Sequence, residues 1–289
     1  MSIAFAIHIK GLFVPKTKAA IDGGFCLQGT NGKAVILIHG LTGTPNEMRF
    51  LANFLNRAGF TVQCPRLANH GTSIHILKKT TWQECYQTVR RTYADLRRSH
   101  DRIYVSGLSM GALLALLLAE EFKATTAAVS CLSPTLFYDG WNCPWYRFLL
   151  PLGYLTPLKH FFYFKEGPPY GVKNEAIRRR IHEYYSRADL DNLQGVDQFG
   201  YPFFPVALLH QLQKLVVYLK GRLPNINAPV QLIQAQHDDM TSVRNAQFIY
   251  DRISSKHKEI VLLHNSYHII TADQERATVA SRMAAFFAP

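Results

Sequence analysis

The most informative part of the sequence is a serine between two glycines, in the pentapeptide Gly107-Leu108-Ser109-Met110-Gly111. The residues before it, 103–106, form a short run typical of a strand, and residues 111–122 after it form an apolar run typical of a buried helix. A sharp strand-to-helix turn strains the serine, and glycines leave space for it. Ser109 would stand at the N-terminus of the helix, whose dipole favours an anion. This context predicts that Ser109 is a nucleophile.

The rest of the chain alternates between strand-like and helix-like patterns. The predicted strands cover residues 33–39, 60–64, 102–106, 125–131, 229–236 and 258–263. The predicted helices between and after them cover residues 47–58, 82–98, 111–122 and 272–287. Nearly continuous apolar strands are typical of a parallel sheet that is buried on both faces, and their alternation with helices indicates βαβ units. We therefore expect an α/β fold with a mostly parallel central sheet flanked by helices.

The alternation stops between residues 135 and 224, where aromatic residues and prolines are frequent. Two helices are predicted there, at 174–187 and 205–219. A segment of about 90 residues is too long for a simple loop. We predict that residues 135–224 form an inserted, largely helical cap (lid), and that residues 1–134 and 225–289 form the core. The aromatic side chains suit the wall of an apolar pocket, although some must pack the cap against the core.

A serine nucleophile on such a sheet needs an acid and then a histidine further along the chain. Asp238 follows the strand at 229–236, at the edge of the sheet where open α/β folds build their sites. We therefore predict that Asp238 is the acid, with the adjacent Asp239 as the alternative.

The predicted base is His268, which lies in the loop after the last strand, 258–263. His264 is the alternative, but it sits at the end of the strand. In the predicted mechanism, His268 takes the Ser109 proton and then returns a proton to the leaving group, while Asp238 orients the imidazole.

The tetrahedral oxyanion needs hydrogen-bond donors, and two backbone N–H groups are candidates. One belongs to Met110, the residue after the nucleophile. The other belongs to Leu41, in the loop after the first strong strand, His39-Gly40-Leu41-Thr42-Gly43. We interpret His39 and His70 as structural residues hydrogen-bonded to nearby backbone.

Five motifs in this order resemble the bacterial carboxylesterase and monoacylglycerol lipase branch of the α/β-hydrolase superfamily. They are His39-Gly40-Leu41-Thr42-Gly43, Asn69-His70-Gly71-Thr72-Ser73, Gly107-Leu108-Ser109-Met110-Gly111, Gln236-His237-Asp238-Asp239 and Ser266-Tyr267-His268. The resemblance implies an α/β-hydrolase fold, the triad and oxyanion residues given above, no cofactor, and a cap at the same insertion point.

Composition narrows the class of protein further. Apolar residues make up 48% of the chain, which argues against disorder. The five cysteines show no zinc-like spacing, and we expect no metal. Residues 1–10 lack the pattern of a secretory signal, and the most apolar run, 112–119, is too short to span a membrane. We expect a cytoplasmic protein with free thiols, and peripheral contact with a membrane stays open.

The net charge of +12 favours an acidic partner, an anionic surface or simply solubility. A group of arginines at positions 90, 91, 97 and 98 is more typical of a solvated helix face than of a nucleic-acid site, so we expect no nucleic-acid partner.

The leading hypothesis is hydrolysis of a small-molecule or lipid-like carboxylic ester with an apolar acyl chain, through an acyl-enzyme on Ser109. The alternative is an esterase or thioesterase, such as a biotin-pathway methyl ester esterase, whose substrate sits on an acidic acyl carrier protein. The cap arginines that would dock this carrier are Arg178, Arg179, Arg180 and Arg187. An acyltransferase and a non-catalytic ligand receptor are two further hypotheses.

Overall fold

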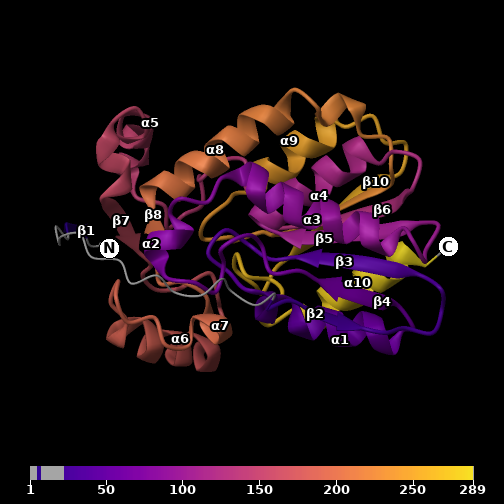
Figure 1. Ribbon diagram of the computed structural model, residues 1–289, viewed down its shortest axis with the longest axis horizontal. Helices are drawn as coiled ribbons and strands as arrows, with labels where there is room; N and C mark the ends of the chain where they lie inside the picture. Colours follow the sequence, from indigo (N-terminus) through magenta and orange to yellow (C-terminus); the bar gives the residue numbers. More distant parts are fainter. Residues whose placement is uncertain (1–4, 8–22, 289) are drawn as a thin grey trace.

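The computed structural model describes residues 5–7 and 23–288, and its centre is a seven-stranded sheet (Figure 1). The strand order is β10-β9-β6-β5-β3-β4-β2. All of its neighbouring pairs are parallel except β2 with β4. The strands are β2 (Phe25–Leu27), β3 (Ala34–Ile38), β4 (Thr61–Cys64), β5 (Ile103–Leu108), β6 (Thr126–Leu132), β9 (Val230–Ala235) and β10 (Lys258–Leu263). The mostly parallel sheet predicted from the sequence is thereby confirmed.

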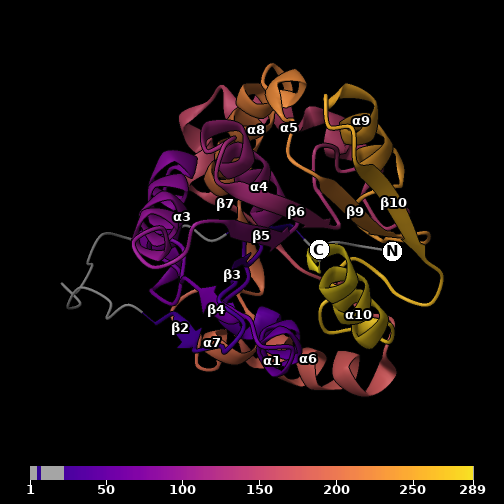
Figure 2. The ribbon, with the colours of Figure 1, turned by 90° about the vertical axis from the view of Figure 1, so that its right-hand side faces the viewer.

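Helices cover both faces of this sheet, as Figure 2 shows. One layer holds α1 (Arg49–Arg57) and α10 (Arg276–Phe287), and the other holds α3 (Trp82–Leu96), α4 (Met110–Glu121), α8 (Val206–Lys220) and α9 (Arg244–Arg252). Side chains of β3 alternate between the layers, as the two-residue period of a strand requires. Val35 and Leu37 pack with α1 and α10, whereas Ile36 and Ile38 pack with the other layer.

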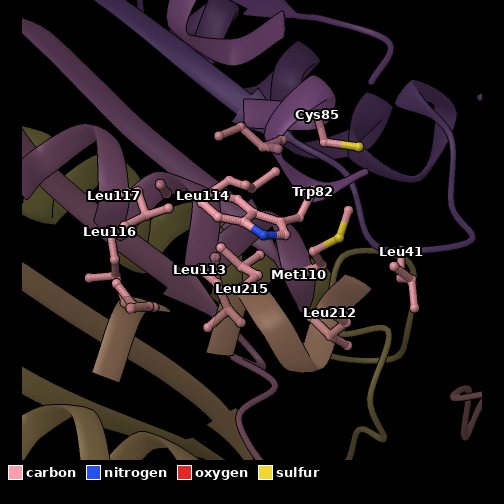
Figure 3. Close-up of a cluster of buried hydrophobic side chains, with 14 of the residues drawn as sticks. Leu41, Trp82, Cys85, Met110, Leu113, Leu114, Leu116, Leu117, Leu212 and Leu215 are labelled. Atoms are coloured by element: carbon pink, nitrogen blue, oxygen red, sulfur yellow. The ribbon is translucent and has the colours of Figure 1, made fainter. Parts of the chain in front are cut away.

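The central helix α4 is enclosed, because it lies between the sheet and the helices α3 and α8. Its residues from Met110 to Ala119 are all buried, which explains why the sequence shows no polar face here. Figure 3 shows the side chains of Trp82, Leu113 and Leu215 in one apolar cluster, although they come from three different helices.

The first turn of α3 is fixed by a reciprocal capping box between Thr81 and Glu84.

The segment between β6 and β9 contains short elements that the sequence patterns did not reveal. It holds η2 (Trp145–Leu149), α5 (Leu150–Tyr154), η3 (Pro157–His160), β7 (Phe162–Lys165), α6 (Glu175–Arg187), α7 (Val196–Phe199), β8 (Phe203–Pro205), α8 and η4 (Leu223–Asn225). Strand β7 pairs with β8 and with β1 (Phe5–Ile7) in a separate antiparallel sheet. The segment predicted as a cap therefore contributes two of the three strands of this small sheet, β7 and β8, and a helix, α8, that also covers the core.

Two boundaries differ from the prediction for identifiable reasons. The closing helix begins at Arg276 and not at residue 272. Just before it, the carboxylate of Asp273 accepts hydrogen bonds from the backbone N–H groups of Lys173 and Tyr267, and Glu275 accepts one from Asn265. These hydrogen bonds connect the segment before α10 to two other loops, so the chain forms turns there and the helix starts later than predicted. The short helix η1 (Pro45–Met48) precedes α1, so the predicted helix at 47–58 is split.

Other expectations concern what the chain lacks. Within residues 5–7 and 23–288, no helix is long and apolar enough to cross a membrane. Across the same described residues, no group of three or more metal-ligating side chains could hold a metal ion. All five cysteines are free. Most of residues 1–10, for which we predict no secretory signal, lies outside the described residues.

The contribution of α4 to stability can be tested at Leu114, whose side chain is completely buried. Leu114→Ala removes apolar contacts and leaves a cavity, so we expect the free energy of unfolding to fall by about 2–5 kcal/mol. Chemical denaturation followed by circular dichroism measures this loss. The control is Val217→Ala on α8, whose side chain is exposed. Equal stability of the two variants would contradict the packing described here.

Candidate active site

Ser109 occupies the turn between β5 and α4 in a backbone conformation that is rare for a serine. Its φ is 57°, which costs about 1–3 kcal/mol for a residue with a Cβ. The neighbouring glycines permit this turn. A Cβ on Gly107 would lie 2.2 Å from the Gly111 backbone, and one on Gly111 would lie 2.2 Å from the Ile38 carbonyl oxygen. Close contact between β5, α4 and β3 therefore depends on both glycines.

The other predicted residues lie at the same edge of the sheet. Leu41 follows β3, Asp238 follows β9 and His268 follows β10, each beyond the carboxyl end of its strand. Ser109 follows β5 in the same way. Parallel strands bring their carboxyl ends to one edge, where open α/β sheets bind ligands.

Asp238 and His268 form a direct, buried pair. His268 Nδ1 lies 2.9 Å from Asp238 Oδ2. The other carboxylate oxygen of Asp238 accepts the backbone N–H groups of Met240 and Thr241 at 2.8 Å each. Gln234 Nε2 donates a further hydrogen bond to Oδ2 at 2.8 Å. Because these donors fix the carboxylate, the ring of His268 has one preferred orientation.

The two alternatives considered from the sequence have different positions. Asp239 accepts the backbone N–H of His268 at 3.2 Å and that of Gly171 at 3.1 Å, so it holds the histidine loop and not the imidazole. His264 is exposed, and its backbone N–H faces Glu275. Of these four candidate residues, Asp238 and His268 are the pair that the structure joins through side chains.

The hydroxyl of Ser109 lies 2.8 Å from the hydroxyl of Thr135, in the loop after β6. Thr135 is buried, and its hydroxyl donates a hydrogen bond to the Ser133 carbonyl oxygen at 3.4 Å. Within the described part of the chain, no hydrogen bond joins Ser109 to His268. The sequence patterns gave no indication of Thr135.

The two predicted oxyanion donors are backbone groups at the ends of β3 and β5. Met110 is the first residue of α4, where N–H groups have no partner within the helix. The Leu41 loop runs beside the nucleophile, since a Cβ on the adjacent Gly40 would lie 3.7 Å from Ser109 Cβ.

Two buried histidines support this loop, as expected from the sequence. His39 Nε2 accepts the backbone N–H of Leu67 at 3.1 Å, so its Nδ1 carries the proton and donates to the Gly40 carbonyl. His70 Nε2 lies 2.8 Å from the Leu41 carbonyl oxygen. Burial lowers the pKa of both side chains, which keeps them neutral.

Three further carboxyl groups surround the pair. Burial raises the pKa of Glu47 to about 7, of Asp239 to about 6 and of Glu166 to about 8. The Glu47 carboxylate accepts the backbone N–H of Gly40. The charge of Asp238 adds to the shift at Asp239, and the charge of Asp239 adds to that at Glu166. Glu47 and Glu166 were not identified from the sequence.

This acidic environment determines the protonation of His268. Burial lowers the pKa of His268, but the charge of Asp238 and its hydrogen bond outweigh burial, so the pKa is raised. The charges of Asp239 and Glu166 act in the same direction. The site therefore stabilises an imidazolium, the form that a general base reaches after taking a proton.

An apolar cavity of about 620 Å³ lies next to these carboxyl groups. Glu166, Asp239 and Met240 line it, whereas Ser109 and His268 do not. Its remaining wall is mostly apolar and comes largely from residues between β6 and α8, including Leu149, Leu150, Phe162, Phe164, Phe204 and Leu209.

Comparisons with known proteins agree with this geometry. The family Hydrolase_4, described as serine aminopeptidase S33, matches residues 29–275. A thermostable monoacylglycerol lipase of Bacillus sp. (strain H-257) is 32% identical over 278 residues, covering 93% of this chain and 96% of that protein. A carboxylesterase of Bacillus subtilis (strain 168) is 26% identical over 253 residues, covering 86% and 89%.

Solved structures show the same fold. One from a study of the metagenome-derived lipolytic enzymes LipS and LipT has a TM-score of 0.75 and 27% identity, covering 91% of this chain and 96% of that chain. The monoacylglycerol lipase of Paleococcus ferrophilus has a TM-score of 0.74 at 18% identity, covering 93% and 98%.

The pH dependence of activity tests the electrostatics of His268. A protonated His268 cannot accept a proton, so kcat/KM should fall as the pH drops through its raised pKa, above the ordinary value of about 6.5. Asp239→Asn removes a charge that favours the imidazolium, so the acid limb should move to lower pH. The control Glu175→Gln changes an exposed carboxyl on α6 and should leave the limb in place. If the pH at which kcat/KM falls were the same in Asp239→Asn as in the wild type, the charge of Asp239 would not control the protonation of His268.

Proposed function

Since the chain belongs to the Hydrolase_4 family, described as serine aminopeptidase S33, and to the carboxylesterase and monoacylglycerol lipase branch of the α/β-hydrolases, we propose that it hydrolyses a carboxylic ester with an apolar acyl chain through an acyl-enzyme on Ser109. The chain is a serine hydrolase. The observation that carries the proposal is the buried Asp238–His268 pair at the sheet edge where the strained turn presents Ser109.

In this mechanism the Ser109 hydroxyl exchanges its Thr135 partner for His268, which takes the proton as Ser109 attacks the ester carbonyl. The backbone N–H groups of Met110 and Leu41 stabilise the oxyanion. His268 then protonates the leaving alcohol, and Asp238 stabilises the transient imidazolium. Water, activated by the same histidine, releases the acid from Ser109.

The apolar cavity beside Glu166 and Asp239 suits the acyl chain. Residues 135–224 act as the cap in this proposal, because most of the cavity wall comes from them. The substrate is therefore a small-molecule or lipid-like ester. A cytoplasmic location accords with the five free thiols.

The alternative partner, an acyl carrier protein docked on the arginines of α6, has less support. Arg179, Arg180 and Arg187 are exposed, but Arg178 already faces Glu175 at 3.6 Å. No residue of α6 lines the cavity, so a carrier bound there would not lie at its wall.

Hydrolysis of p-nitrophenyl esters, from acetate to long acyl chains, tests the proposed function. Ser109→Ala removes the nucleophile, so we expect kcat to fall by about four to six powers of ten. The matched control is Ser106→Ala in β5. Its buried hydroxyl has no hydrogen-bond partner among residues 5–7 and 23–288, so this variant should keep its activity. An optimum at longer acyl chains would agree with the apolar cavity. Undiminished hydrolysis by Ser109→Ala would disprove the assignment of the nucleophile.

A further inference from the structure

The Leu41 loop, residues 39–43, folds around a glutamate side chain that follows it in the sequence. The loop turns back on itself, since the Gly43 N–H donates to the Gly40 carbonyl oxygen at 3.3 Å. Glu47 of η1 reaches into this turn, where its carboxylate accepts the Gly40 N–H. A Cβ on Gly43 would lie 2.2 Å from Glu47 Oε2, so the turn closes tightly on the carboxylate.

This carboxylate has the loop backbone as its partner. Burial raises the pKa of Glu47 to about 7, whereas the Gly40 N–H and the charge of His268 lower it. Among residues 5–7 and 23–288, no Lys, Arg or His side chain forms an ion pair with Glu47. Placing a carboxyl group in such a site is unfavourable unless hydrogen bonds compensate for lost water. The hydrogen bond from Gly40 supplies part of this compensation.

Gly40 directly precedes the Leu41 N–H, which is the proposed oxyanion donor. Glycine has no Cβ, so the peptide group that follows Gly40 can rotate unless other contacts hold it. Glu47 holds the N–H of Gly40, and His39 Nδ1 lies 3.0 Å from its carbonyl oxygen. In the described part of the chain, the Leu41 N–H donates to no other group, so it is available to a ligand.

We propose that Glu47 is a positioning residue, whose carboxylate holds Gly40 so that the Leu41 N–H points at the oxyanion formed beside Ser109. A Cβ on Gly40 would lie 3.7 Å from Ser109 Cβ, so a rotation at Gly40 changes the position of the donor relative to the reacting carbon. A misplacement of about 1 Å can lower a rate about a hundredfold. The inference rests on the proposed ester hydrolysis, because this reaction forms the oxyanion.

Hydrolysis of p-nitrophenyl esters by Glu47→Ala and Glu47→Gln tests the inference. Alanine removes the acceptor, so we expect kcat to fall about 10- to 100-fold with little change in KM. A contact made only in the transition state produces this pattern, because it does not contribute to substrate binding. Glutamine keeps an oxygen that accepts the Gly40 N–H, so kcat should stay within about threefold of the wild-type value.

Binding of an alkyl trifluoromethyl ketone separates this role from a general loosening of the site. The Ser109 oxygen bonds to the carbonyl carbon, the Ser109 proton passes to His268, and the carbonyl electron pair becomes an oxyanion. The corresponding trifluoromethyl carbinol has the same alkyl chain but cannot add to the serine. Glu47→Ala should weaken binding of the ketone by about 10- to 100-fold and leave the affinity for the carbinol unchanged.

Glu84→Ala on α3 is the matched control. It also removes a carboxylate that accepts a backbone N–H, that of Thr81 at 2.7 Å. Glu84 does not line the cavity. This variant should keep the wild-type kcat and the wild-type affinity for the ketone.

Three results would overturn the inference: an undiminished kcat in Glu47→Ala, a loss in Glu47→Gln as large as that in Glu47→Ala, or equal weakening of the ketone and the carbinol. Each of them can occur in a protein that hydrolyses esters, so none of them rejects the proposed function.

A wild-type protein that hydrolyses no ester would instead reject the proposed function, and hydrogen–deuterium exchange would then test the contact itself. The Gly40 N–H should exchange slowly in the wild type and in Glu47→Gln, and about tenfold faster or more in Glu47→Ala. Equal exchange in the three proteins would show that Glu47 does not hold the loop. The two failures are therefore distinguishable.

Discussion

Close backbone contact between β5, α4 and β3 holds Ser109 at its positive φ, and the proposed chemistry depends on this contact. Gly107 and Gly111 allow it, because a Cβ on either would overlap a neighbouring backbone. The strain is offset by the burial of α4 from Met110 to Ala119 between the sheet and its helices. A loosely packed α4 would let the turn relax and would move the serine away from the sheet edge.

The second constraint is the balance of charge around His268. Asp238 is fixed by hydrogen bonds from Gln234 and from the backbone of residues 240 and 241, and so it orients the imidazole. Glu47, Asp239 and Glu166 are buried near enough to interact, and burial raises the pKa of each. Burial therefore disfavours the charged form of each of these carboxyl groups.

The sequence was most informative where local pattern and tertiary structure coincide. The apolar runs of β3, β5 and α4 predicted their own structure, because strands buried on both faces carry nearly continuous apolar residues. The positions of Asp238 and His268 followed from the ends of predicted strands. Thr135, Glu47 and Glu166 were missed because their importance comes from contacts distant in sequence. Strands β7 and β8 are too short for a recognisable period, and they are stabilised by pairing with each other.

The central claim is that Ser109 is a nucleophile activated by His268. Reaction with an alkyl p-nitrophenyl phosphonate, followed by mass spectrometry of the intact protein and its peptides, tests it most directly, because the reagent phosphonylates an activated serine much faster than other side chains. The account predicts one adduct per chain, located on Ser109, and a rate that collapses in His268→Ala. An adduct on another residue, or an undiminished rate in His268→Ala, would contradict it.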